Sequence, residues 1–323
     1  MSEPQIDQRR ADGSLRHLLT LENLPRREIE RLLNKAESFV RPLGTRPPTS
    51  QALSGVTVAN LFTEPSTRTR VSFELAAKRL GAAVVNLEVQ LSSRVKGESM
   101  LDTVFTLQSV HVDVMVIRDA EPGVPALVAA NVAPHVSVLS AGEAHVSHPT
   151  QGLLDALTVR QHKKRFEGLS IAVVGDIRHS RVARSAFHAF QTLGVTDLRI
   201  VAPSVLMPES DEFPGCSRHT TLDTGLVDAD VIMMLRIQKE RMGQADLPDA
   251  DRYFSQYGLT PERLALARPD AIVMHPQPMN RGIEIASDVA DGRQSVIRDQ
   301  VRNGVAVRMA VLADVIGSRV NAS

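Results

Sequence analysis

The chain has 323 residues, which is long for one compact core and predicts two domains of ordinary size. Its 37 basic and 37 acidic residues balance, so we expect no general attraction to nucleic acid or to an anionic membrane. With 3% aromatic residues, one cysteine and no long apolar run, the composition argues against a base-stacking surface, a disulfide framework, a thiolate zinc cluster and a membrane span. Cys216 is expected to be a packed or surface residue. The polar residues 1–13 lack an apolar signal core, so a cytoplasmic protein is expected.

The first half of the chain predicts alternating helices and strands. Apolar residues at three- and four-residue steps predict a helix over residues 25–40, and the prolines of residues 41–54 predict a loop. Short apolar, β-branched runs predict strands at residues 56–61, 82–87, 112–117 and 136–139. Helices are predicted between them at residues 71–80, 98–109 and 124–130. Such alternation is typical of βαβ units, in which helices cover both faces of a mostly parallel sheet.

The same pattern starts again after residue 151. A predicted helix at residues 152–163 joins the halves, and a final helix is predicted at residues 304–316. Strands are predicted at residues 171–174, 198–201, 231–235 and 271–274, again with helices between. The polar segment 236–257 predicts a long connection, either functional or a solvated excursion. The predicted fold class is therefore α/β, with two doubly wound domains that each hold a mostly parallel sheet flanked by helices.

The segment FTEPSTRTR at residues 62–70 stands between a predicted strand and a predicted helix. Backbone N–H groups at a helix start, two hydroxyl side chains and an arginine would all face one point, which suits a phosphate or carboxylate dianion. Serine and threonine are also good N-cap residues, so spacing alone leaves an ordinary capped helix equally open.

Three other places carry candidate polar side chains. Arg118 ends a predicted strand, where ligands bind in parallel sheets, although a salt-bridge role is the commoner one for such an arginine. His148 begins the segment HPTQ, yet His145 nearby shows that a histidine alone carries little information. Residues 175–181 follow a strand as GDIRHSR, which invites a dinucleotide interpretation, but the Gly-x-Gly-x-x-Gly fingerprint is missing.

Residues 62–70 resemble the carbamoyl-phosphate-binding signature of the aspartate and ornithine carbamoyltransferase family, and further motifs match along nearly the whole chain. Glu64 resembles the aspartate branch, because the ornithine branch usually carries lysine there. The resemblance implies a carbamoyl-phosphate-binding domain of residues 1–149 plus 304–323 and an aspartate-binding domain of residues 150–303. It also implies an active site in the cleft between the two domains.

The resemblance implies a role for each polar residue of the first domain. Arg118 would reach the phosphate and the carbonyl oxygen, His148 would donate to the carbamoyl oxygen, and Gln151 would contact the carbamoyl nitrogen. Because two arginines would surround it, we expect His148 to act as a neutral donor. The phosphate cradle would consist of Ser66, Thr67, Arg68 and Thr69. The implied catalytic residues are Arg68, Thr69, Arg118, His148 and Gln151.

Two further residues, Ser92 and Lys96, resemble a serine and a lysine that enter the active site of a neighbouring subunit in a trimer. Both would bind carbamoyl phosphate, and Lys96 would bind aspartate as well. A homotrimer with shared active sites is therefore expected, and a monomer would be inactive. Glu64, Glu240 and Arg241 resemble residues whose ion pairs form in a closed state, and we expect them to bias domain closure.

The second domain would hold the amino-acid acceptor. By resemblance, Arg181 clamps the α-carboxylate of aspartate, while Arg236 and Gln238 hold its side-chain carboxylate. Two fixed guanidiniums favour a dicarboxylic acceptor over cationic ornithine. The segment HPQP implies a cis peptide between Gln277 and Pro278, with a backbone carbonyl aimed at the substrate amine. Some relatives carry leucine in place of Gln277, which concerns packing more than the proposed contact.

The expected reaction transfers the carbamoyl group of carbamoyl phosphate to L-aspartate, the committed step of de novo pyrimidine biosynthesis leading to UMP. No metal, cofactor or covalent nucleophile is expected, because phosphate is already a good leaving group. Regulatory or dihydroorotase-like chains are possible partners, whereas nucleic acid and membrane are not expected. The alternatives are a carbamoyltransferase with another acceptor, a non-catalytic scaffold, and a nucleotide-dependent dehydrogenase, which would lack its phosphate-binding glycines.

Overall fold

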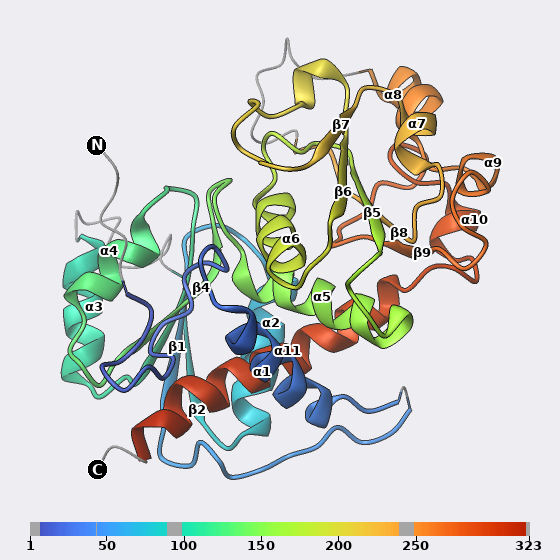
Figure 1. Cartoon of the computed structure of the whole chain (residues 1–323). Helices are drawn as coiled ribbons and strands as arrows, with labels where there is room; N and C mark the ends of the chain where they lie inside the picture. The colour runs from blue at the N-terminus through green and yellow to red at the C-terminus, as the bar shows by residue number, and fades with distance from the viewer. Residues whose placement is uncertain (1–6, 43, 89–98, 239–248, 321–323) are drawn as a thin grey trace. The chain divides into compact units, whose positions relative to one another are not determined.

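A computed structural model describes residues 7–42, 44–88, 99–238 and 249–320, except for the side chains of residues 88 and 318–320. The chain divides into two compact units (Figure 1). The first unit comprises Met1–Leu153 and Asn303–Ser323, and the second comprises Leu154–Arg302.

The first unit contains a four-stranded parallel sheet in the order β2-β1-β3-β4. Its strands are β1 (Thr57–Phe62), β2 (Ala83–Glu88), β3 (Val114–Asp119) and β4 (Ser137–Glu143). Its helices are α1 (Arg26–Phe39), α2 (Thr67–Arg79), α3 (Met100–Ser109) and α4 (Val124–Asn131). Every residue of β3 and β4 is buried; the first four residues of β3 form an apolar run, whereas β4 also buries Ser137, Ser140 and Glu143.

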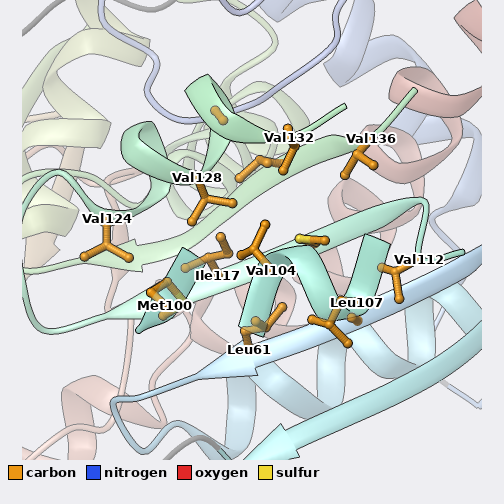
Figure 2. Close-up of a cluster of buried hydrophobic side chains, with 14 of the residues drawn as sticks. Leu61, Met100, Val104, Leu107, Val112, Ile117, Val124, Val128, Val132 and Val136 are labelled. Carbon is orange, nitrogen blue, oxygen red and sulfur yellow. The ribbon is translucent and has the colours of Figure 1, made fainter. Parts of the chain in front are cut away.

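Helices cover both faces of this sheet. Alternate strand residues such as Leu61 and Ile117 share one face, where they cluster with Val104 of α3 and Val128 of α4 (Figure 2). On the other face, α2 buries Phe73 completely, and the guanidinium of Arg308 lies 5.0 Å from the centre of its ring. Burying a side chain of this size stabilises the fold by about 1.5–3 kcal/mol.

The last helix belongs mainly to the first unit. Helix α11 (Ile297–Val320) supplies Arg308 and also Asp314, whose carboxylate pairs with Arg31 of α1. Val315 accepts a hydrogen bond of 2.8 Å from Arg10 near the start of the chain. These contacts join both ends of the sequence to the helices beside the first sheet, and Figure 1 shows α1 and α11 together there.

The second unit contains a five-stranded parallel sheet in the order β7-β6-β5-β8-β9. Its strands are β5 (Ser170–Val174), β6 (Asp197–Val201), β7 (Ser217–His219), β8 (Val231–Met234) and β9 (Ile272–Met274). The longer helices are α5 (Pro149–Lys163), which begins in the first unit, α6 (Arg181–Thr192) and α8 (Ala250–Tyr257). The shorter ones are η3 (Ser204–Leu206), α7 (Leu222–Leu226), α9 (Pro261–Leu264) and α10 (Ser287–Ala290).

The predicted fold class, two doubly wound α/β domains with parallel sheets flanked by helices, is confirmed. Three predictions of detail were wrong. Helix α2 begins at Thr67, before residue 71, and strand β7 was missed because its three residues carry no apolar pattern. The segment 236–257 is not one connection, because α8 occupies its end, with Asp249 as N-cap and a stacked pair of buried tyrosines, Tyr253 and Tyr257.

None of the helices in the part of the chain that the structure describes is both long enough and apolar enough to cross a bilayer. The single cysteine, Cys216, lines a small apolar cavity beneath α6 together with Phe187 and Phe190. Burial raises the pKa of its thiol to about 11, so the thiol is protonated at neutral pH and has no activated character.

Candidate active site

The strand order of the first unit creates a switch point between β1 and β3. The chain leaves β1 towards β2 on one side and leaves β3 towards β4 on the other, so the loops that follow β1 and β3 diverge. Ligands of open parallel sheets bind at such a point, beyond the carboxyl ends of the strands. Phe62 and Arg118 pair in register at that edge, so the segment after β1 and the end of β3 lie side by side.

The segment after β1 forms the N-terminus of α2. The helical ladder begins where the Arg70 N–H donates to the Ser66 carbonyl at 3.1 Å, so the amides of residues 67–69 precede it. Ser66 occupies the N-cap position, yet within the described chain its side chain makes no capping hydrogen bond. By contrast, Ser99 and Ser180 cap α3 and α6 through their side chains. Unlike those two serines, Ser66 makes no hydrogen bond from its hydroxyl to the described first turn of its helix. This difference favours the interpretation of the segment as an anion-binding site.

The exposure of the four cradle residues differs. Thr69 is buried, Ser66 is half-buried, and Thr67 and Arg68 are exposed. A surface arginine at the first turn of a helix can approach an incoming anion without first losing a buried environment. The described geometry therefore brings hydroxyls, amides and one exposed guanidinium to the start of α2.

Arg118 is the buried arginine of this edge, with 8% of its surface exposed. It lies within β3, which runs to Asp119, and so it belongs to the strand that was expected to stop before it. Its Nη1 donates to the Ala141 carbonyl at 3.2 Å, and its Nη2 donates to Glu64 Oε1 at 2.7 Å. Its own carbonyl accepts from the amide and hydroxyl of Thr63 at 3.0 and 3.2 Å. These bonds hold the guanidinium next to the segment that leads into α2.

His148 and Gln151 lie at the N-terminus of α5, the helix that follows β4. Both are buried, with 4% and 7% of their surfaces exposed. The His148 carbonyl accepts from the amides of Gln151 at 2.9 Å and Gly152 at 3.2 Å, which starts the helix. The predicted residues Ser66 to Thr69, Arg118, His148 and Gln151 therefore all follow or end neighbouring strands at one edge of the first sheet.

The second sheet has its own switch point, between β5 and β8. Arg181 is the first residue of α6, which follows β5, and only 5% of its surface is exposed. Arg236 comes two residues after β8 and is half-buried; its Nη2 lies 3.4 Å from Gln238 Oε1. The two predicted acceptor arginines thus start from the two strands that flank this switch point.

Gly175 allows the two loops to approach closely. Its φ of +127° lies in the region that favours glycine, and a Cβ there would collide with the Leu235 carbonyl oxygen. The Leu235 amide donates to the Val174 carbonyl at 2.7 Å, so the loops start side by side. Only glycine fits this contact without a shift of backbone.

Asp176 was not predicted, yet it connects the two loops. Its carboxylate is fully buried and accepts from the Gln238 amide at 3.0 Å through Oδ2. Its Oδ1 accepts from the His179 amide at 3.2 Å and lies 2.8 Å from His179 Nδ1. The sequence signal that could have identified it is an acidic residue placed directly after a buried strand.

A third loop, at residues 275–278, follows β9, the neighbour of β8. The predicted cis peptide between Gln277 and Pro278 is confirmed. His275 is buried beneath this loop, Gln277 is half-buried and Pro278 is exposed. The loops that follow β5, β8 and β9 therefore all begin at the same edge of the second sheet.

Four predicted residues lie outside the described residues: Ser92, Lys96, Glu240 and Arg241. Within the described ranges, no group of three or more histidine, cysteine, aspartate or glutamate side chains could hold a metal ion.

Both units match known carbamoyltransferase domains. Residues 16–161 match the family described as aspartate/ornithine carbamoyltransferase, carbamoyl-P binding domain, and residues 167–315 match its Asp/Orn binding domain. The chain belongs to the aspartate/ornithine carbamoyltransferase family. It is accordingly a carbamoyltransferase.

Solved structures of this family superpose well on the chain. Aspartate transcarbamoylase from Trypanosoma cruzi, in complex with carbamoyl aspartate and phosphate, is 31% identical with a TM-score of 0.83, over 93% of this chain and 95% of that chain. The same enzyme with carbamoyl phosphate has a TM-score of 0.81, at 31% identity over 93% and 96% of the two chains. Ornithine carbamoyltransferase from Pyrococcus furiosus is 29% identical with a TM-score of 0.80, over 94% and 97% of the chains. Because both kinds of enzyme match at similar identity, the overall similarity does not distinguish aspartate from ornithine as the acceptor.

Proposed function

We propose that this carbamoyltransferase acts on carbamoyl phosphate and L-aspartate and forms N-carbamoyl-L-aspartate and phosphate. The observation that carries the proposal is the pair of arginines at the switch point of the second sheet, Arg181 and Arg236. A guanidinium binds a carboxylate through two parallel hydrogen bonds, and a dicarboxylic amino acid offers one carboxylate to each arginine.

The first unit takes the carbamoyl phosphate in this proposal. Ser66, Thr67, Arg68 and Thr69 bind the phosphate with the amides and hydroxyls at the start of α2, as helix N-termini bind anions generally. Arg118 binds the phosphate and the carbonyl oxygen, His148 donates to the carbonyl oxygen, and Gln151 binds the carbamoyl nitrogen. Ser92 and Lys96, reaching in from a neighbouring subunit, complete the set.

The chemistry needs positioning and charge stabilisation. The aspartate amine attacks the carbonyl carbon, a C–N bond forms, and the carbonyl oxygen gains negative charge in the tetrahedral intermediate. Donors such as Arg118 and His148 lower the energy of that oxyanion. The bond from carbon to the phosphate oxygen then breaks, the phosphate leaves, and it accepts a proton from the amine. Holding the two substrates together supplies much of the remaining rate enhancement.

The acceptor is aspartate rather than ornithine because of local charge. An ornithine side chain would bring an ammonium group towards Arg181 and Arg236, and like charges in a partly buried site repel each other strongly. Gln238, Gln277 and Pro278 complete the acceptor site; the backbone carbonyl of the last loop faces the amine. Glu64 fits the same assignment, because the ornithine branch usually has lysine at this position.

The proposal extends to the setting of the reaction. It places the enzyme in the cytoplasm, at the committed step of pyrimidine biosynthesis, as a homotrimer whose active sites lie in a cleft between the two domains and are shared between subunits. It assigns residues 1–149 plus 304–323 to the carbamoyl-phosphate-binding domain and residues 150–303 to the aspartate-binding domain. Regulatory or dihydroorotase-like chains would bind outside these sites.

The test is the ureido product formed from carbamoyl phosphate with aspartate or with ornithine. We expect product with aspartate and none above background with ornithine. Arg68→Ala should abolish turnover while the protein keeps its circular-dichroism spectrum. Efficient carbamoylation of ornithine, or a largely active Arg68→Ala variant, would refute the assignment.

A further inference from the structure

His275 is a buried histidine to which neither the sequence motifs nor the proposed reaction assigns a role. Only 1% of its surface is exposed, and it directly follows β9 at the start of the loop that carries Gln277 and Pro278. Its Nδ1 accepts a hydrogen bond of 2.8 Å from the Gln277 amide. Its own amide donates to Gln300 Oε1 at 2.8 Å, and Gln300 Nε2 donates to Asp155 Oδ1 at 2.9 Å. The histidine is thus anchored on its backbone side while its ring holds the loop.

Glu284, nine residues after His275 in the chain, is the second member of this buried pair. Its side chain is fully buried, and its Oε1 lies 3.1 Å from His275 Nε2. The same oxygen accepts from the Asn280 amide at 2.5 Å. One buried pair therefore binds backbone amides on both sides of residues 278 and 279.

These contacts define the protonation state of the ring. A backbone amide can only donate, so Nδ1 of His275 must carry a lone pair, and Nε2 must carry the proton that it shares with Glu284. An imidazolium, or the other neutral tautomer, would point an N–H at the amide of Gln277. The loop geometry is therefore compatible with one form of the ring.

The held residue needs such support. Gln277 has a φ of +59°, in the left-handed region that costs a non-glycine residue about 1–2 kcal/mol. A conformation of this kind persists where surrounding contacts over-determine it. Tyr253 is buried as well, and desolvation together with the charges of Glu284 and Asp176 raises the pKa of its phenol above the ordinary range. The phenol therefore stays neutral.

We propose that His275 and Glu284 are positioning residues for the amino-acid acceptor. Together they fix the backbone of residues 277–280, the part of the loop that binds the acceptor. The inference rests on the proposed function only in naming that loop as an acceptor-binding element. Neither side chain touches a reacting atom in this account. Disturbing the pair should therefore weaken acceptor binding and leave carbamoyl phosphate binding intact.

Two substitutions of the same histidine separate its two bonds. His275→Asn can place its amide oxygen near the position of Nδ1 and so keep an acceptor for the Gln277 amide. His275→Gln reaches towards the position of Nε2 and keeps a donor for Glu284 but loses that acceptor. We expect His275→Gln to raise the KM for aspartate about tenfold or more, and His275→Asn to stay within about threefold of the wild type. The KM for carbamoyl phosphate should change less than about twofold in both.

The inference is overturned if the two variants raise the KM for aspartate equally, if both KM values rise together, or if neither changes. Glu284→Gln, which keeps the shape and the acceptor oxygen, should follow the milder pattern. Should wild-type protein prefer an acceptor other than aspartate, the proposed function fails, and the same variants measured with that acceptor still test the positioning role.

A readout independent of turnover checks the ring itself. In protein labelled with ¹⁵N-histidine, the His275 resonances, assigned by their loss in His275→Asn, should show an unprotonated Nδ1 and a protonated Nε2 at pH 7.5. A protonated Nδ1 would contradict the bond to Gln277 whatever the substrate of the enzyme.

Discussion

Arg118 and Glu64 form an ion pair at the edge of the first sheet, with Nη2 and Oε1 2.7 Å apart. Their side chains are only 10% and 24% exposed, so the pair is less screened by solvent than an ordinary surface pair. The same guanidinium is proposed to bind the phosphate dianion. On that proposal, Glu64 competes with the substrate phosphate for Arg118.

The competition predicts the effect of Glu64→Gln on anion binding. Removing one negative charge beside Arg118 should tighten orthophosphate binding about fivefold, which corresponds to about 1 kcal/mol. Isothermal titration calorimetry measures this affinity directly. Glu30→Gln is the matched control, because Glu30 pairs with Arg26 on α1 and its loss should leave phosphate affinity unchanged. Weaker or equal binding by Glu64→Gln would show that the ion pair does not oppose the anion.

Arg181→Ala should weaken acceptor binding selectively. A hydrogen-bonded ion pair to a carboxylate contributes about 1.5–3 kcal/mol, so the KM for aspartate should rise about 10- to 150-fold. The KM for carbamoyl phosphate should change little. Arg178→Ala serves as the control in the same turn, because Arg178 is 43% exposed and pairs with Glu209, itself 70% exposed. An equal loss in both variants would point to general disruption of the turn.

Gly175→Ala tests the close approach of the two acceptor loops. The new methyl group would collide with the Leu235 carbonyl oxygen and force the segments that carry Arg181 and Arg236 apart. We expect a lower Tm and a KM for aspartate raised at least tenfold. Gly168→Ala is the matched control, because Gly168 also has a positive φ, +71°, but nothing lies within 4 Å of the added methyl. That variant should lose stability only through backbone strain, about 1–2 kcal/mol, and keep its KM.

His17 should account for part of the folding stability that the first unit loses at acidic pH. Burial, with the nearby charges of Arg16 and Arg10, lowers its pKa from 6.5 to about 3, and its Nδ1 accepts from the Val138 amide at 3.0 Å. The unfolded chain then binds a proton below pH 6.5 that the folded chain refuses until about pH 3, so folding stability falls with falling pH across that window.

Replacement of His17 measures this contribution. Between pH 7.5 and 5.5 the wild type should lose about 1.4 kcal/mol more free energy of unfolding than His17→Asn, which can still accept from Val138. Urea unfolding at the two pH values provides the comparison. His135→Asn, at an exposed position, should behave as the wild type does. Parallel pH curves for His17→Asn and the wild type would mean that His17 is protonated alike in both states.

The sequence predicted the parts of the fold and site that depend on local pattern. Strands β1 and β3 lie inside the first sheet and are mostly buried, so their apolar runs were visible in the sequence, and the polar segment after β1 indicated where a helix starts. Strand β7 was not predicted because Ser217–His219, at the edge of the sheet, is short and polar. The cis bond at Gln277 followed from resemblance alone, since no local pattern distinguishes it from a trans bond.

Long-range polar contacts account for most of what was missed. Asp176 bonds to an amide 62 positions away, and His275 to a glutamine 25 positions away. Neither partner is specified by neighbouring residues, because the contact exists only once the strand order has brought two loops together. The start of α2 was placed too late because the first four residues of the helix, 67–70, are all polar and show no apolar periodicity.

The most direct test of the account is the binding of N-(phosphonacetyl)-L-aspartate, which carries a phosphonate and two carboxylates in one molecule. Calorimetry should give one molecule per chain, with affinity reduced about 10- to 150-fold by Arg118→Ala in the first unit and by Arg181→Ala in the second. Phosphonoacetate, which lacks the aspartate part, should respond to Arg118→Ala alone. If either arginine can be removed without loss of affinity for the larger compound, the two units do not bind the substrates as proposed.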